Sequence, residues 1–231
     1  ESIDGMAEAC EGLGLPVIGG NVSLYNESGG NDIDPTPVVG LLGVVDSLVA
    51  PPPGWAWNEG DTLVLVGRRS APDPQPFPLG GTKWATMRGR RGGRVPAFDP
   101  GLFARTVRFV ASEVAAICAA NASDVTAVHD VGGGGLAVAL AEMVAVTGVG
   151  AEVGALLGHG ELFSEFPGRF VMTTDDVEAF SVRAQAAGVA LARLGTIGGS
   201  RLRIAGAIDL SVDDIAERRR DALEDALASA V

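Results

Sequence analysis

Proline is the feature that most restricts how this chain can fold, because it fixes the backbone and removes an amide donor. Twelve of the 13 prolines fall within the first 100 residues, and the densest run is Pro51-Pro52-Pro53-Gly54. Such a run interrupts both helices and central strands, which indicates a connector. We therefore predict a first part over residues 1–50, a linker over 51–61 and a second domain over 62–231.

Hydrophobic spacing predicts alternating helices and strands on both sides of this connector. In the first part, a helix from Ile3 to Leu13 precedes apolar strands at 15–18 and 38–45, in a piece too small to bury a core alone. In the second part we expect strands at 62–67, 125–131, 169–173, 191–196 and 201–205, and helices at 100–121, 136–146, 176–187 and from residue 211. The alternation predicts an α/β or α+β fold.

The charge of the chain limits its partners. Seventeen basic residues stand against 29 acidic ones, a formal charge of −12, which argues against a general nucleic-acid binder. Lys83 is the single lysine, and no stretch reaches the roughly 18 apolar residues that span a bilayer, so we expect no membrane association. Cys10 and Cys118 have no metal-like spacing and indicate buried thiols in a reducing cytoplasm. The first residue is Glu1, which suggests a piece of a longer or processed protein.

The first candidate site is the loop Gly19–Asn26, which follows a predicted buried strand. Glycine lets a backbone approach a phosphate closely, the oxygen of Asn21 could bind Mg²⁺, and the hydroxyl of Ser23 could contact a phosphate or substrate. The alternative is a polar turn held by local side-chain hydrogen bonds.

The second candidate site is His129-Asp130-Val131 followed by four glycines, between a predicted strand and a predicted helix. A glycine turn at a helix start presents N–H groups and the positive end of the dipole to an anion. The spacing matches neither a dinucleotide fingerprint nor a P-loop. The alternative is a tight turn with a hydrogen bond between His129 and Asp130.

Two further segments carry charge. Seven of the 17 basic residues fall between 68 and 94, which would suit an anionic ligand or a solvated loop. Arg169 could contact a phosphate or pair with Glu161 or Glu165. Neither a nucleophile elbow nor a zinc pattern is present in the sequence.

Several motifs together resemble the phosphoribosylformylglycinamidine synthase family, in its PurL-type synthetase subunit. The run Gly20-Asn21-Val22-Ser23-Leu24-Tyr25-Asn26 is the most specific of them. The others, in order, are 35–40, 61–66, Leu79-Gly80-Gly81, 129–131 with 134–143, Leu162-Phe163 with Arg169, and 194–199. They cover nearly the whole chain and correspond to the C-terminal part of that subunit.

The resemblance implies the tail of a PurM-N-like ATP-binding domain followed by a PurM-C-like α/β domain. It implies an ATP-dependent ligase of purine biosynthesis that amidates formylglycinamide ribonucleotide with ammonia from a glutaminase subunit, together with a small accessory subunit. Gly20 would contact ATP, Asn21 would bind Mg²⁺ and Ser23 would contact the substrate. The catalytic histidines of the family would lie outside this chain, so we expect the fragment alone to be inactive.

A phosphate or nucleotide loop at His129, Asp130, Gly134, Gly135 and Arg169 is a weaker expectation. The chain departs from the family pattern there, with Gly132-Gly133 in place of Ser-Asp and Lys83 where an acidic residue is common.

Two alternatives to the ligase stay open from the sequence. One is a non-catalytic nucleotide-binding or assembly half. The other is a different member of the same ATP-dependent superfamily, of the aminoimidazole ribonucleotide synthetase, selenophosphate synthetase or thiamine-phosphate kinase type.

Overall fold

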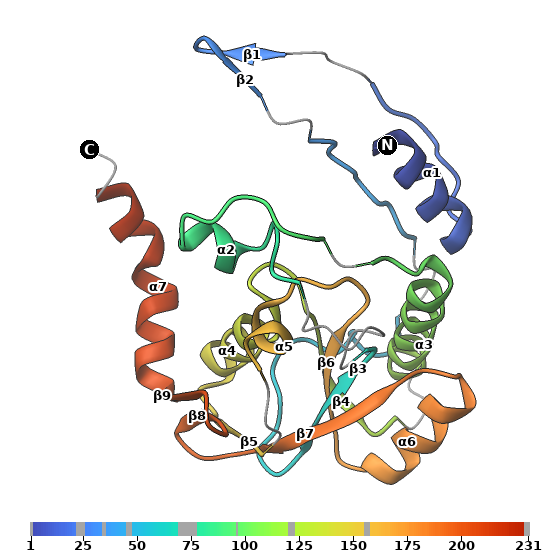
Figure 1. Ribbon diagram of the computed structural model, residues 1–231. Coiled ribbons are helices and arrows are strands. Elements are labelled where there is room, and N and C mark those ends of the chain that lie inside the picture. Colours follow the sequence, from blue (N-terminus) through green and yellow to red (C-terminus); the bar gives the residue numbers. More distant parts are fainter. Residues whose placement is uncertain are drawn as a thin grey trace. The chain divides into compact units, whose positions relative to one another are not determined.

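The structure is a computed structural model of the 231-residue chain (Figure 1). It describes residues 2–21, 26–33, 36–44, 48–68, 78–95, 97–119, 123–154 and 158–228. Internal contacts divide the chain into two compact units, Glu1–Leu48 and Val49–Val231.

The first unit contains one helix and one short hairpin. Helix α1 spans Ser2–Leu13 and ends at Gly14, whose φ of 72° is left-handed, as the sequence predicted. Strands β1 (Glu27–Ser28) and β2 (Asn31–Asp32) pair antiparallel. The turn between them is Gly29-Gly30, with φ of 60° and 79°. Two positive φ values in succession are what a tight two-residue hairpin requires, and glycine adopts them without strain.

The prediction of two strands in the first unit was wrong for the residues that the structure describes. Residues 15–18 and 36–44 carry no strand, and Val45 lies outside the described residues. Their apolar side chains are exposed, 82% for Ile18 and 95% for Val38. A strand is held by hydrogen bonds to a neighbouring strand. Among the described residues of this unit, no strand pairs with either of these two runs.

A seven-stranded sheet forms the second unit, in the order β4-β6-β3-β7-β5-β8-β9. Its strands are β3 Thr62–Val66, β4 Val125–Asp130, β5 Ala151–Val153, β6 Phe170–Thr174, β7 Leu191–Ile197, β8 Arg201–Ile204 and β9 Ile208–Ser211. Neighbouring strands are antiparallel except β5 and β8, which are parallel. The sheet is therefore mixed, consistent with the predicted class.

Helices cover both faces of this sheet (Figure 1). On one face lie α4 (Gly135–Thr147), α5 (His159–Phe163) and α7 (Val212–Ala228), and on the other lie α3 (Pro100–Cys118) and α6 (Val177–Ala186). Leu63 and Leu65 of β3 pack into the core beside α4, whereas Val64 and Val66 pack into the core beside α3 and α6. The continuous apolar run of β3 reflects burial on both of its faces.

Most predicted elements of the second unit are present. Asp99 caps α3 by accepting a hydrogen bond from the N–H of Leu102 at 2.9 Å, and Asp176 caps α6 in the same way. The predicted end of the first of these helices at Asn121 lies outside the described residues. The short elements α2 (Lys83–Met87), α5, β5 and β9 were not predicted, because three to five residues hold too little periodicity.

The segment after the proline run packs against the rest of the second unit. Trp57 is buried, and its indole N–H donates to the carbonyl of Val149 at 3.1 Å. The carbonyl of Gly54 accepts a hydrogen bond from the N–H of Val128 at 3.1 Å, on the outer edge of β4. The division by contacts lies between Leu48 and Val49, slightly before the predicted linker. That the first unit belongs to an ATP-binding-type domain stays a prediction.

Candidate functional site

The glycine turn between β4 and α4 has the backbone shape that only glycine adopts easily. Gly134 caps α4 with a φ of 90°, and Gly135 follows with a φ of 75°. A Cβ added to Gly135 would lie 2.6 Å from the carbonyl oxygen of Leu162. The turn therefore packs directly on the backbone at the end of α5.

A carboxylate of the protein itself occupies the donors of this turn. The Oε1 atom of Glu165 accepts hydrogen bonds from the N–H of Gly134 at 2.9 Å and from the N–H of Lys83 at 2.6 Å. The N–H of Gly135 donates to the carbonyl of Gly132 at 3.0 Å. The negative charge that helix physics favours here is thus supplied internally. Phosphate binding by Gly134 and Gly135 stays a prediction.

The positions at which the sequence departs from the family pattern lie together. A Cβ built on Gly133 would lie 3.8 Å from Cε of Lys83, so the lysine stem runs along the glycine turn. Lys83 and the glycine turn therefore share Glu165, whose Oε1 atom also accepts the backbone N–H of Lys83.

His129 faces inward and Asp130 faces solvent. The imidazole of His129 is 6% exposed and stacks on Trp55, with ring centroids 4.4 Å apart. Its Nδ1 lies 2.6 Å from the backbone carbonyl of Asp130, and its Nε2 lies 3.3 Å from Oε2 of Glu142. The closest contact of the His129 ring with Asp130 is therefore to the main chain and not to the carboxylate. The same ring contacts Trp55 of the connector and Glu142 of α4.

Arg169 is hydrogen-bonded to the backbone at the end of α5. Its side chain is 1% exposed, with Nη1 donating to the carbonyl of Glu161 at 3.1 Å and Nη2 donating to the carbonyl of Ser164. Burial lowers the pKa of Arg169 to about 10, and the nearby charge of Glu161 partly opposes that shift. Bonds to main-chain carbonyls favour a structural role over contact with a phosphate, and the predicted contact with ligand is untested.

The residues predicted to bind ATP and metal lie in the first unit. Gly20 and Asn21 are exposed and follow α1 in irregular backbone, while Ser23 lies outside the described residues. Among the described residues, no three His, Cys, Asp or Glu side chains gather as a metal site would require. Asn21 fits Mg²⁺ only as one neutral oxygen ligand, with the remaining oxygens supplied by a nucleotide, by water or by protein beyond these residues.

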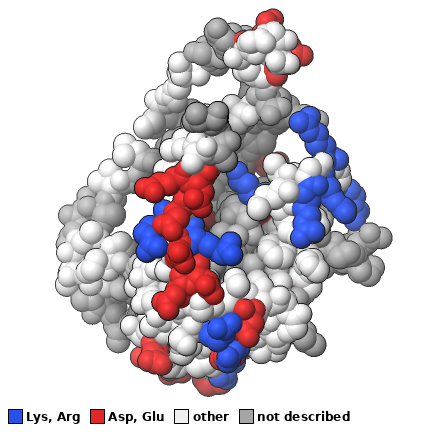
Figure 2. Space-filling model, turned by 90° about the vertical axis from the view of Figure 1, so that its left-hand side faces the viewer, with Lys and Arg blue, Asp and Glu red and all other residues white. Residues whose placement is uncertain are grey.

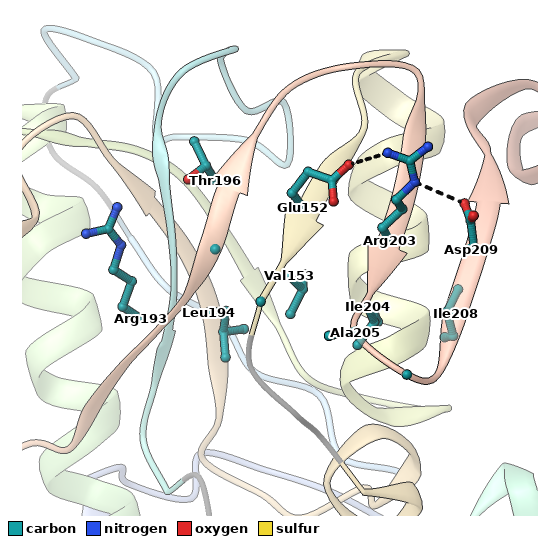
Figure 3. A pocket seen from close by; sticks show the side chains of 13 residues that line it. Glu152, Val153, Arg193, Leu194, Thr196, Arg203, Ile204, Ala205, Ile208 and Asp209 are labelled. Atoms are coloured by element: carbon teal, nitrogen blue, oxygen red, sulfur yellow. Dashed lines mark hydrogen bonds and ion pairs between the residues drawn. The ribbon is translucent and has the colours of Figure 1, made fainter.

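A cavity of about 690 Å³ lies over β7, β5, β8 and β9 (Figure 3). Three of its four charged side chains form a ladder across three strands, and the fourth, Arg193, lies apart from them (Figure 3). Arg203 donates to Glu152 at 2.8 Å and lies 3.4 Å from Asp209. These partners raise the pKa of Arg203, and Arg201 together with Arg203 lowers the pKa of the Asp209 carboxyl. Because these three charges pair with one another across neighbouring strands, the ladder stabilises an exposed sheet face.

Sequence reasoning missed the role of Glu165 and the stacking of Trp55 on His129. Glu165 lies 31 positions from Gly134, and no local pattern signals that its carboxylate would cap the turn.

None of the helices in the described ranges is long and apolar enough to cross a bilayer.

Comparison with known proteins identifies the second unit. The family model for AIR synthase related protein, C-terminal domain, matches residues 58–205. The chain belongs to this family. Its sequence is also 37% identical over 230 residues to the PurL subunit of phosphoribosylformylglycinamidine synthase from Renibacterium salmoninarum, covering 94% of this chain and 28% of that protein. The same subunit from Brucella ovis gives 37% identity over 228 residues, with the same coverage.

Solved structures show the same fold. The structure of T. maritima PurL complexed with FGAR matches with a TM-score of 0.54 and 18% identity, over 71% of this chain and 29% of that chain. Phosphoribosylformylglycinamidine synthase II from Thermotoga maritima matches with a TM-score of 0.52 and 18% identity, over 71% of this chain and 27% of that chain. The predicted resemblance to PurL-type subunits and the predicted fold class are confirmed. The chain spans less than a third of the length of these relatives.

Proposed function

We propose that this chain is the C-terminal portion of an ATP-dependent ligase that converts formylglycinamide ribonucleotide and ammonia into formylglycinamidine ribonucleotide. The observation that carries the proposal is the 37% identity to PurL subunits over 94% of the chain. The activity belongs to a longer protein, because the chain corresponds to 28% of such a subunit. Ammonia would come from a glutaminase subunit, with a small accessory subunit in the same cytoplasmic complex.

Three residues of the first unit carry the proposed roles. The backbone of Gly20 would contact ATP, the amide oxygen of Asn21 would hold Mg²⁺, and the hydroxyl of Ser23 would contact the ribonucleotide. Bound Mg²⁺ would supply charge stabilisation to the transferred phosphoryl group. A structure of similar fold is a complex of PurL with FGAR, which supports a ribonucleotide substrate.

Kinetics of the full-length protein test this assignment. We expect Asn21→Ala to raise the Mg²⁺ concentration needed for half-maximal turnover and to lower turnover. Ser23→Ala should raise KM for the ribonucleotide by about two- to tenfold, the loss of one hydrogen bond. Asn31→Ala and Ser28→Ala are matched controls, because both positions are exposed in the hairpin outside the motif. An unchanged Mg²⁺ dependence in Asn21→Ala would refute the metal role.

The same preparation separates the ligase from a non-catalytic assembly half. A ligase forms the amidine product from ATP, ammonia and ribonucleotide without the glutaminase, and from glutamine only with it. The 231-residue chain alone should form none. Product formation by the isolated chain would contradict the proposal that the catalytic groups lie elsewhere in the protein.

A further inference from the structure

A second cavity, of about 590 Å³, lies beside the glycine turn. Lys83, Trp84 and Arg88 line it from α2 and the residue after it, and His159 and Phe163 line it from α5. Gly134, at the start of α4, and the turn between β8 and β9 complete the wall. Its volume falls within the range of small-ligand sites.

Aromatic rings form one side of this cavity. The ring centroids of Trp84 and His159 are 6.4 Å apart, and those of His159 and Phe163 are 6.2 Å apart. The guanidinium carbon of Arg88 lies 5.0 Å from the centroid of the Trp84 ring, and that of Arg90 lies 6.0 Å from it. Aromatic and guanidinium planes of this kind are surfaces on which a planar heterocycle stacks.

The cavity is cationic in a protein that is strongly acidic. Lys83 and Arg88 line it, and none of its described lining residues is Asp or Glu. Two carboxylates are hydrogen-bonded to the backbone of its wall. Oε1 of Glu165 accepts the N–H groups of Lys83 and Gly134, and Oε2 of Glu161 accepts the N–H of Gly158. Figure 2 shows a column of acidic side chains with basic side chains beside it, and a further group of basic side chains apart from this column on the same face. Arg88, Arg90, Arg91 and Arg94 are all exposed.

We propose that this cavity binds a heteroaromatic anion of the size of a nucleoside monophosphate. Its ring would pack against Trp84 and His159, and its phosphate would face the Lys83 ammonium and the Arg88 guanidinium. An aromatic platform next to two cations matches a ligand that joins a planar base to an anionic group. This site is in the second unit and involves neither Asn21 nor Mg²⁺, so it does not rest on the proposed ligase function.

Titration calorimetry of the 231-residue chain tests the proposal, with AMP as the probe and no divalent cation present. Adenosine lacks the phosphate and ribose 5-phosphate lacks the base, so each should bind at least tenfold more weakly than AMP. We expect Trp84→Leu to weaken AMP binding by about fivefold to a hundredfold, the range measured for loss of a stacking partner. Arg88→Gln should weaken it by about tenfold, from loss of a charge-assisted contact.

Controls keep the outcome decisive. Arg91→Gln removes an exposed charge from the same segment that does not line the cavity, and should leave AMP affinity unchanged. The proposal is overturned if AMP gives no saturable heat up to about 5 mM, if ribose 5-phosphate binds as tightly as AMP, or if Trp84→Leu and Arg88→Gln bind AMP like the unaltered chain.

Discussion

Replacing Gly135 by alanine should destabilise the second unit more than any change of one methyl group at its surface. Gly135 stands at the start of α4 with a φ of 75°, which an L-residue adopts at a cost. The added Cβ would also lie 2.6 Å from the carbonyl oxygen of Leu162 and 2.8 Å from that of Ser164. Both contacts are to backbone, which cannot rotate away as a flexible side chain would.

The expected loss has two parts. A left-handed backbone conformation costs an L-residue roughly 1–2 kcal/mol. Forcing a methyl group into a packed region costs about 1–3 kcal/mol. Together they lower the free energy of unfolding by about 2–5 kcal/mol, which is a large share of the roughly 5–15 kcal/mol that holds a typical domain folded.

Gly199→Ala separates the two parts. Gly199 has the same φ of 75°, but a Cβ there would meet nothing within 4 Å. Urea unfolding followed by circular dichroism should therefore show a loss of only about 1–2 kcal/mol for Gly199→Ala. If the two variants lose the same stability, or if Gly135→Ala loses less, the close approach of the turn to α5 does not constrain this position and the argument is refuted.

Two further predictions concern Glu165 and Arg169. Glu165→Gln keeps an oxygen for the N–H groups of Lys83 and Gly134, whereas Glu165→Ala leaves both N–H groups without that acceptor. In urea unfolding, the alanine variant should therefore lose about 1–2 kcal/mol more of the free energy of unfolding than the glutamine variant. Equal losses would show that water replaces the carboxylate. For Arg169, burial lowers the folded pKa to about 10, below its ordinary value, so above about pH 9 the unfolded chain holds more protons and stability rises with pH. The stability of the unaltered chain relative to Arg169→Met should increase by roughly 1 kcal/mol from pH 8 to pH 10.5; a constant difference, or one that shrinks, would contradict the sign.

Sequence patterns predicted the second unit well where the pattern was long. The run Leu63–Val66 is apolar because both faces of β3 are buried. The helices predicted from residues 100 and 176 begin at Pro100 and Val177, directly after their capping residues Asp99 and Asp176. The prediction of strands at 15–18 and 38–45 was wrong for the described residues, because it rested on short apolar runs alone. A hydrophobic run alone does not make a strand, because a strand forms only where a neighbour donates and accepts hydrogen bonds.

The site was only partly predictable from sequence. The glycine turn was predicted because positive φ at consecutive positions has a direct compositional signal in Gly134 and Gly135. Its carboxylate partner Glu165 was not, because the contact depends on how the chain returns 31 residues later. In the same way Trp84 and His159 lie 75 positions apart in sequence, and only the packing of α2 against α5 brings their rings together.

The internal carboxylate changes where an anion would be recognised in this domain. A glycine turn at a helix start ordinarily offers its own N–H groups to a phosphate. In this chain the N–H of Gly134 is already bound by Glu165, so the positive charge that remains toward the cavity belongs to the side chains of Lys83 and Arg88. Side-chain charges in a solvent-accessible cavity are screened by salt, with a Debye length of about 8 Å at physiological ionic strength. Binding of an anion there should therefore weaken as salt is added, whereas stacking on Trp84 should persist, because it does not depend on the net charge of the ligand.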